Sequence, residues 1–225
     1  MAHLKRLSVP TSWSVKKKGI TFIARPSPGP HKKSQAMTLN YIVKDLLKIA
    51  QTTREVKKVL HAGNILVDTI ARKDHHFPVG VMDIITIPSQ KESYVSLYAD
   101  DGKFILKKLK SHTEEKLCKI IGKRILAKKK VQLNLYDGKN LLIDKDSYKV
   151  GDTILLAKGR IVKHLKMEKG ALIYLIGGKH IGKLGQLIEI KHFKGMENDR
   201  IIIESGEKKI ETLKDYAFII EKSWE

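Results

Sequence analysis

Hydrophobic residues recur at helical spacing in only one part of the chain, between positions 39 and 62. The apolar positions 39, 42, 43, 46, 47 and 50 form one stripe and predict a first helix that starts at Leu39. A second helix follows closely, because Thr52 and Glu55 have the spacing of a capping box and Gly63 suits the left-handed end of a helix. Its inward face is expected to consist of Val56, Val59 and Leu60.

Strand patterns begin directly after this second helix. A tight turn at Gly63 and Asn64 is expected to lead into a short strand from Ile65 to Val67, and a later apolar run predicts a strand from Val81 to Ile87. Between them lies a loop that carries Arg72 and Lys73. The pattern over residues 39–90 therefore predicts two helices followed by a turn and strands, and we expect this stretch to be one unit of the chain.

The middle of the chain, residues 91–169, alternates short apolar runs with turn residues and is predicted to be rich in β-structure. The dipeptides Asp101-Gly102 and Asp137-Gly138 are typical of hairpin turns. One short helix is expected to interrupt the strands, because Ser111 and Glu114 again have capping-box spacing and Cys118 follows in the same stretch. The fold class predicted for the whole chain is α+β and mainly β.

The last region, residues 170–225, carries a glycine-rich loop between two apolar runs. Further apolar runs at Ile201–Ile203 and Phe218–Ile220 supply enough strands for a small closed barrel. The loop is expected to be tight and to include residues with positive φ angles or with backbone pressed against RNA, among Gly177, Gly178, Gly182 and Gly185.

Charge narrows the choice of partner, because 44 Lys and Arg against 24 Asp and Glu give a formal net charge of +20. A field of this strength concentrates polyanions, so RNA, DNA or an anionic membrane surface are the partners to consider. No apolar run approaches 18 residues and no signal-peptide core is present, so we expect a soluble intracellular chain without a membrane partner. A single cysteine cannot form an internal disulfide.

The first 38 residues are the most one-sided in charge, with eight Lys or Arg and no Asp or Glu. Three prolines between Arg25 and Lys33 deny this segment a helix or a central strand. We expect a basic extended segment that lacks a fold of its own and orders against RNA, with a solubilising tail as the alternative. Its candidate RNA-binding residues are Lys5, Arg6, Lys16, Lys17, Lys18, Arg25, His31, Lys32 and Lys33.

A second group of basic residues lies on the polar face of the second predicted helix. Arg54, Lys57, Lys58 and His61 recur at i, i+3, i+4 and i+7, so several donors could meet one phosphate backbone, although a merely solvated face has the same pattern. Residues 103–130, with eleven basic and two acidic residues, are expected to add a positive surface, whereas residues 196–225 reverse the charge. Further RNA-binding candidates are the loop residues Arg72, Lys73, Lys179, His180 and Lys183, whereas Gly63 is expected to shape the backbone of its turn only.

Enzymatic interpretations find little support. Gly177–Lys183 fits the pattern G-x-x-x-x-G-K of a phosphate-binding loop, but Leu184 lacks the hydroxyl that ligates magnesium and a strand is expected where that motif needs a helix. His75 and His76 are adjacent rather than at ligand spacing, so neither a metal nor a cofactor is expected. Cys118 is interpreted as a small buried residue. We therefore expect neither catalysis nor a small-molecule substrate.

Five motifs in a fixed order carry a family resemblance. They are His3-Leu4-Lys5-Arg6, the run from Arg25 to Lys32, Glu55-Val56-Lys57-Lys58, the run from Pro78 to Asp83, and the loop from Gly177 to Gly185. Through them the chain closely resembles, over essentially its whole length, small-subunit ribosomal protein four of the archaeal and eukaryotic (e) type.

The resemblance implies identities for individual regions. Residues 42–85 resemble the RNA-binding domain of this family, which bacterial protein four and some pseudouridine synthases share, and residues 171–205 resemble a KOW segment of an SH3-like barrel, whose glycine loop meets RNA. Pro28 stands where some relatives have a small hydroxyl residue, with no clear consequence. The chain stops at Glu225 without the extra segment of eukaryotic members, which favours an archaeal source.

The function implied is that of a structural constituent of the small subunit in the cytoplasmic ribosome, with ribosomal RNA and neighbouring ribosomal proteins as partners. Each module would bind the phosphates and groove shape of a different RNA helix, and their linkage on one chain would fix the helices relative to each other. Two alternatives remain: an RNA-modifying enzyme of the pseudouridine-synthase kind, and a KOW-type transcription or assembly factor. The first needs a large catalytic domain, which the two small β-rich regions do not provide.

Overall fold

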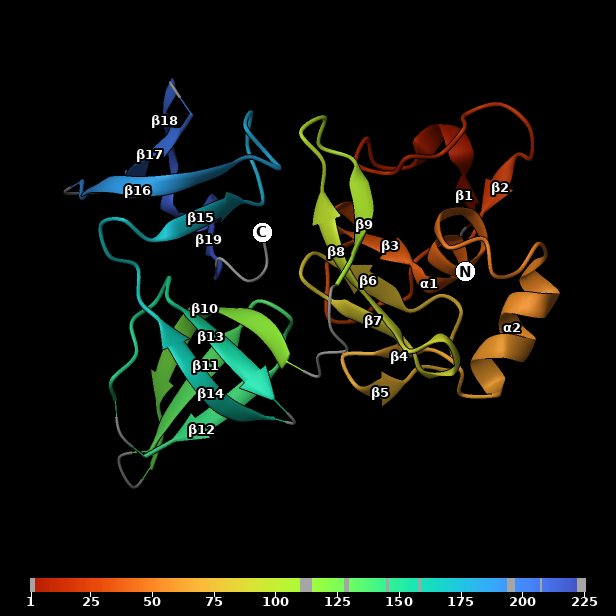
Figure 1. The fold of residues 1–225 in the computed structure, drawn as a ribbon, viewed down its shortest axis with the longest axis horizontal. Coiled ribbons are helices and arrows are strands. Elements are labelled where there is room, and N and C mark those ends of the chain that lie inside the picture. Colours follow the sequence, from red (N-terminus) through yellow and green to blue (C-terminus); the bar gives the residue numbers. More distant parts are fainter. Residues whose placement is uncertain are drawn as a thin grey trace. The chain divides into compact units, whose positions relative to one another are not determined.

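The computed structural model describes residues 3–109, 115–127, 130–144, 146–157, 159–193, 197–206 and 208–221. The chain divides into two compact units, residues 1–116 and 117–225. Strands make up most of the regular structure of both units (Figure 1), which confirms the prediction of a mainly β protein. Within the described ranges, no helix is long and apolar enough to cross a membrane.

The two predicted helices both belong to the first unit. The first begins as α1 (Leu39–Tyr41) and continues as a π-helical turn (Ile42–Leu46), so it is shorter than the apolar stripe indicated. The second, α2 (Thr53–His61), buries Val56 and Leu60 as expected.

Local capping interactions set both ends of α2. At the start, the Thr52 hydroxyl oxygen accepts a hydrogen bond from the backbone N–H of Glu55 at 3.3 Å, and the Glu55 carboxylate accepts from the backbone N–H of Thr52 at 3.4 Å. At the end, Gly63 adopts a φ of 74° and its N–H bonds to the carbonyl of Leu60 at 3.0 Å. Both the capping box and the left-handed stop are therefore confirmed.

The strands of the first unit form one five-stranded antiparallel sheet and two small ribbons. The sheet has the order β5-β4-β7-β8-β9, and the ribbons pair β1 with β2 and β3 with β6. The bounds are β1 (Leu4–Lys5), β2 (Phe22–Ile23), β3 (Ala36–Thr38), β4 (Leu66–Val67), β5 (Ile70–Ala71), β6 (Pro78–Gly80), β7 (Ile84–Ile87), β8 (Glu92–Tyr98) and β9 (Phe104–Lys108). The expected hairpin turn between β8 and β9 is present, since Gly102 has a φ of 74°.

The continuous strand predicted from Val81 to Ile87 is wrong in its first half. The chain turns between β6 and β7, where Met82 adopts a φ of 65°. The turn is held by the Asp83 carboxylate, which accepts a hydrogen bond from the backbone N–H of Gly80 at 2.8 Å. The apolar pattern alone does not reveal this turn, because every residue from Val81 to Ile87 is buried.

The basic N-terminal segment packs into the first unit, so the expectation that it lacks a fold of its own is wrong for its described part. Trp13 is only 3% exposed, and its indole N–H donates to the carbonyl of Ala36 at 2.8 Å. The backbone N–H of Phe104 in β9 donates to the carbonyl of Ser12 at 2.8 Å. Further apolar side chains of the segment that the structure buries are Leu4, Val9 and Val15.

The second unit contains two five-stranded antiparallel sheets, with the orders β12-β11-β10-β13-β14 and β18-β17-β16-β15-β19. The bounds are β10 (Glu115–Ile125), β11 (Val131–Leu135), β12 (Asn140–Ile143), β13 (Thr153–Ala157), β14 (Arg160–Leu165), β15 (Leu172–Leu175), β16 (Leu184–Lys191), β17 (Arg200–Ser205), β18 (Lys208–Leu213) and β19 (Ala217–Ile219). The predicted turn between β11 and β12 is present at Gly138, whose φ is 77°.

The short helix predicted around Cys118 is wrong. Ser111 and Glu114 lie outside the described residues, but Cys118 lies in the long strand β10, where pairing with β11 overrides the local capping signal. Its side chain is 2% exposed and packs with the core of the first sheet, so the interpretation of Cys118 as a buried residue is confirmed. Each sheet has its own buried cluster of aliphatic side chains.

Candidate nucleic-acid interface

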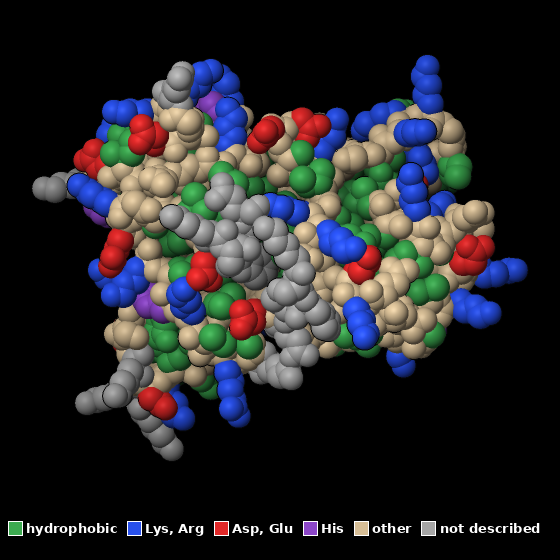
Figure 2. All heavy atoms as spheres, in the orientation of Figure 1, with side chains coloured by type: hydrophobic (Ala, Val, Ile, Leu, Met, Phe, Trp, Pro, Cys, Tyr) green, Lys and Arg blue, Asp and Glu red, His purple; other side chains and the backbone are tan. Residues whose placement is uncertain are grey.

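The exposed face of α2 carries a row of basic side chains, with Glu55 as its one acidic residue. Arg54, Lys57, Lys58 and His61 are all exposed, while Val56 and Leu60 anchor the opposite face in the core. Figure 2 shows Lys and Arg side chains projecting outward on the side of the first unit where α2 lies. Because the capping interactions fix this helix, the four donors are held in one row on a rigid element, which suits contact with successive phosphates.

The N-terminal segment presents most of its basic side chains to solvent. Arg6 is half-buried instead, and its Nη1 donates to the carbonyl of Lys16 at 3.2 Å, across the loop between β1 and β2. This loop carries three consecutive lysines without an intervening acid. The exposed candidates are Lys5, Lys16, Lys17, Lys18, Arg25, Lys32 and Lys33.

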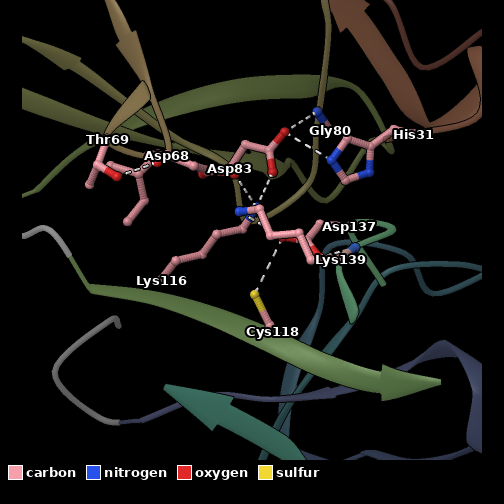
Figure 3. Close-up of polar contacts among 10 residues, drawn as sticks. His31, Asp68, Thr69, Gly80, Asp83, Lys116, Cys118, Asp137 and Lys139 are labelled. Carbon is pink, nitrogen blue, oxygen red and sulfur yellow. Dashed lines mark hydrogen bonds and ion pairs between the residues drawn. The ribbon is translucent and has the colours of Figure 1, made fainter. Parts of the chain in front are cut away.

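His31 does not belong to this surface, and we withdraw it from the RNA-binding set. Its side chain is 2% exposed, and its Nε2 lies 2.9 Å from Oδ2 of Asp83 (Figure 3). A Cβ at Gly80 would lie within 2.3 Å of the His31 ring, so this position is restricted to glycine by the packed imidazole. The run from Arg25 to Lys33 is thus anchored to the core by His31, while Lys32 and Lys33 stay exposed.

Asp83 is the centre of a buried charge network in the first unit (Figure 3). Its Oδ1 lies 2.5 Å from the Nζ of Lys116, which also lies 2.5 Å from Oδ2 of Asp68. Burial alone would raise the pKa of Asp83, but the Lys116 ammonium and the His31 imidazole outweigh it and hold the pKa well below its usual range. The network therefore keeps a buried carboxylate ionised.

Two lysines from the basic run at 103–130 are also buried, so the expected positive surface there is smaller than the count indicates. Lys116 is 6% and Lys119 is 4% exposed. The ammonium of Lys119 donates to the carbonyl of Asp215 at 2.7 Å, and burial lowers the pKa of Lys119 to about 8. The exposed members among the described residues are Lys103, Lys107, Lys108, Arg124 and Lys130.

The loop candidates Arg72 and Lys73 differ in accessibility. Lys73 is exposed, whereas Arg72 is half-buried with its guanidinium 4.5 Å from the centre of the Phe77 ring. This cation–π contact holds the guanidinium against the ring. Arg72 is therefore a packed donor rather than a freely moving one.

The glycine loop between β15 and β16 is shaped by contacts within the second unit. Gly178 and Gly182 have φ angles of 81° and 88°, as predicted for a tight loop. A Cβ at Gly177 would lie 2.6 Å from the Tyr216 ring, and one at Gly185 would lie 2.6 Å from the carbonyl oxygen of Glu204. The backbone of these two glycines is therefore closely approached by protein atoms.

The basic residues of this loop are presented unevenly. Lys179 is exposed, whereas His180 and Lys183 are half-buried. The strand β16 follows Lys183, as expected, where a phosphate-binding loop would continue into a helix.

We expect Gly182→Val to destabilise the second unit by about 1–3 kcal/mol, because a β-branched residue is strained at a φ of 88°. Lys183→Gln should leave stability unchanged and reduce RNA binding, with a salt dependence of log K smaller by about 0.7–0.9, the value of one phosphate contact. Urea denaturation and filter binding at several salt concentrations measure the two effects. Equal RNA binding by Lys183→Gln and the parent would remove the loop from the interface.

One polar surface was not singled out from the sequence. On β10 and β11, Arg124 lies opposite Gln132, and the Gln132 amide donates to the Asn134 side chain at 2.9 Å. The alternation of β11, with Val131, Leu133 and Leu135 buried, places these amides on the outer face of the sheet. The alternation of apolar and polar residues over Val131–Leu135 is visible in the sequence. The uncharged amides of Gln132 and Asn134 do not by themselves indicate RNA binding in a chain with so many lysines.

Comparisons with known proteins agree on one family. The model described as "Ribosomal family S4e" matches residues 90–159, and the one described as "RS4NT (NUC023) domain" matches residues 2–34. The chain is 38% identical over 229 residues to small ribosomal subunit protein eS4 of Methanococcus vannielii, covering 97% of this chain and 93% of the relative. It is 40% identical over 222 residues to eS4 of Archaeoglobus fulgidus, covering 98% of this chain and 93% of the relative.

A solved structure resembles the fold as well. The crystal structure of the 30S ribosomal protein S4e from Thermoplasma acidophilum superposes with a TM-score of 0.71 at 32% sequence identity. The match covers 84% of this chain and 97% of that protein.

Proposed function

Because this chain belongs to ribosomal family S4e, we infer that it is a structural, non-enzymatic component of the small ribosomal subunit in the cytoplasm and that it supports translation. Its partners are ribosomal RNA and other ribosomal proteins. The net charge of +20 suits a polyanion of this kind. Membership of this family does not favour the two alternatives, an RNA-modifying enzyme and a KOW-type transcription or assembly factor.

The observation that assigns RNA binding to particular residues is the row of basic side chains on α2. Three permanent cations, Arg54, Lys57 and Lys58, are exposed on one face of a helix whose other face is buried. Side chains held in this way contact the phosphate backbone without separate ordering of each donor. We assign α2 as the main phosphate-binding element of the first unit.

The arrangement of strands in the second unit and the division of the chain into four parts support the same function. We assign the sheet β18-β17-β16-β15-β19 to an SH3-like barrel of the KOW type, supported by its five antiparallel strands and the glycine loop between β15 and β16. The four-part division, with boundaries near residues 38, 90 and 169, is likewise proposed. In this arrangement the basic residues of the N-terminal segment, α2 and the glycine loop contact different stretches of RNA, and affinity accumulates because one chain carries all three.

The test replaces Arg54, Lys57 and Lys58 together by Gln. If all three contact phosphates, log K for small-subunit ribosomal RNA should lose roughly 2–3 units of slope against log salt, at about 0.7–0.9 per phosphate. The melting temperature should change little, because exposed charges contribute about 0–1 kcal/mol each to stability. Filter binding at several salt concentrations and a thermal melt measure both.

A matched pair of lysines provides the control. Lys208 and Lys209 are adjacent and exposed, like Lys57 and Lys58, but lie in the acidic C-terminal part of the chain. Changing Lys208 and Lys209 to Gln should leave the salt slope within experimental error. A slope that falls by the same amount per replaced residue in the α2 variant and in the Lys208/Lys209 variant would mean that only total charge matters and that α2 makes no specific contact.

A further inference from the structure

A cavity of about 300 Å³ lies in the first unit between the N-terminal segment and the start of α2. Its apolar wall comes from the β1–β2 ribbon and the residues beside it, chiefly Ile20, Phe22 and Ile23. Phe22 is 50% exposed, and its ring centre lies 5.2 Å from that of His3, with the two rings tilted by 50°. An aromatic ring left half-exposed beside a cavity offers a face on which a flat ligand can stack.

The polar wall of this cavity contains buried groups without partners. Asn40 is only 7% exposed, and its Oδ1 has no hydrogen-bond partner within the described part of the chain. The Nε of Arg6 is buried and lacks a partner among the described residues as well. Both residues line the cavity. A buried polar atom without a hydrogen bond is costly, so a water or a ligand that bonds to it would stabilise the protein.

The histidine pair at the cavity adds a defined acceptor. Nδ1 of His76 lies 2.8 Å from the carbonyl oxygen of Arg25. A carbonyl only accepts, so Nδ1 carries the proton, and Nε2 is an acceptor when the ring is neutral. Burial, followed by the neighbouring His76 and Lys57, lowers the pKa of His75. The lowered pKa favours the uncharged form of the His75 ring.

The cavity reaches the start of α2. Thr53, the first residue of α2, lines it, and the charge of Lys57 reaches His75. An RNA strand whose phosphates follow Arg54 and Lys57 would therefore pass the mouth of the cavity.

We propose that this cavity binds the base of a single unstacked nucleotide of the RNA that α2 holds. The base would stack on Phe22, and its polar edge would pair with Asn40 and Arg6. This is how proteins read single-stranded RNA sequence: an extruded base is stacked on an aromatic ring and its edge is hydrogen-bonded. The inference rests on the proposed function, because it requires the RNA to be present.

The charge of the lining favours a base over a bare phosphate. Arg6 and Lys44 supply two permanent cations, but the Asp45 carboxylate also lines the cavity. Asp45 would repel a phosphate inside and can instead accept from a ring N–H or amino group of a base. The volume lies at the small end for ligand cavities, which suits one base.

Filter binding of the full-length chain to deproteinised archaeal small-subunit ribosomal RNA, at several salt concentrations, tests this inference. Phe22→Leu keeps an apolar side chain and removes the stacking ring, so binding should weaken about 5- to 150-fold, the value of stacking one base. The slope of log K against log salt should stay that of the parent, because no phosphate contact is lost. Ala24→Leu, which fills the cavity from its lining, should weaken binding in the same way.

Phe193→Leu is the matched control, since Phe193 is also an exposed phenylalanine beside an arginine, with the Arg200 guanidinium 5.3 Å from its ring centre. It should bind as the parent does. Parental affinity in both Phe22→Leu and Ala24→Leu overturns the cavity inference alone, as does an equal loss in Phe193→Leu. A parent without salt-dependent RNA binding overturns the proposed function and this inference together. If Phe22→Leu lowers the melting temperature, its loss of binding can come from unfolding, and the RNA affinity of Ala24→Leu then decides whether the cavity binds a base.

Discussion

Lys116→Met is expected to lower the free energy of unfolding of the first unit by about 3–5 kcal/mol, the usual cost of removing one partner from a buried ion pair. Lys116 lies 2.5 Å from both Asp68 and Asp83, and Asp83 is 1% exposed. Without the ammonium, two carboxylates would face each other with little water to screen them. Chemical denaturation followed by circular dichroism measures the loss.

Lys108→Met is the control in the same unit. Lys108 pairs with Glu92 at the surface, where its side chain is 58% exposed, so this change should cost only about 0–1 kcal/mol. Similar losses in the two variants would show that the network around Asp83 has no special weight.

The pH dependence separates lost charge from lost packing. In the parent, the pKa of Asp83 lies below the value of about 3.9 for an unfolded chain, so its stabilising effect is complete above that pH and is lost as the pH falls through the folded value. In Lys116→Met only His31 is left to oppose burial, so the pKa of Asp83 should rise above its value in the parent and the penalty of the buried carboxylate should fade on acidification. The gap between variant and parent should narrow from pH 7 towards pH 4. A constant gap would mean lost packing.

Features set by neighbours in sequence were predicted well. The α2 helix has its start, its end and its basic face within a dozen residues, so the capping box at Thr52 and the stop at Gly63 were readable directly. The turns at Gly102 and Gly138 belong to the same class, because the geometry of a hairpin turn requires positive φ angles.

Features that depend on residues distant in the sequence were not predicted. The capping spacing of Ser111 and Glu114 suggested a helix, but the following residues extend as β10 because β11 pairs with them. Lys116 contacts Asp83 at a separation of 33 residues, and Lys119 contacts Asp215 at a separation of 96. Nothing in a basic run distinguishes such lysines from those that face solvent, so a surface inferred from composition includes some buried charges.

The candidate RNA-binding residues divide in the same way. The exposed rows at Arg54 and Lys57 follow from helical periodicity, whereas His31 was assigned to the surface only because it stands in a basic run. The cavity beside Phe22 was also invisible, because it joins residues from the N-terminal ribbon, α1 and the loop before β6. The feature that reveals the cavity is the buried Oδ1 of Asn40, which has no hydrogen-bond partner among the described residues. This feature can be seen only in the three-dimensional structure.

The N-terminal segment provides the second large effect. Trp13→Ala is expected to destabilise the first unit by about 3–5 kcal/mol, and deletion of residues 1–38 should prevent it from folding. Trp13 stacks on Tyr41 with ring centres 6.1 Å apart, and the Tyr41 hydroxyl donates to the carbonyl of Ser14 at 2.7 Å. Loss of the indole would leave a large cavity and an unpaired Ala36 carbonyl. Circular dichroism and urea denaturation report the change.

A charge-only variant of the same segment separates folding from RNA binding. Lys16, Lys17 and Lys18 are all exposed in the loop between β1 and β2, so their joint replacement by Gln should leave the melting temperature nearly unchanged. If they contact phosphates, the slope of log K against log salt should fall by roughly 2–3 units. A stable deletion variant would show that the segment is a free tail despite the burial of Trp13. An unchanged slope in the lysine variant would show that the segment contributes to the core and never touches RNA.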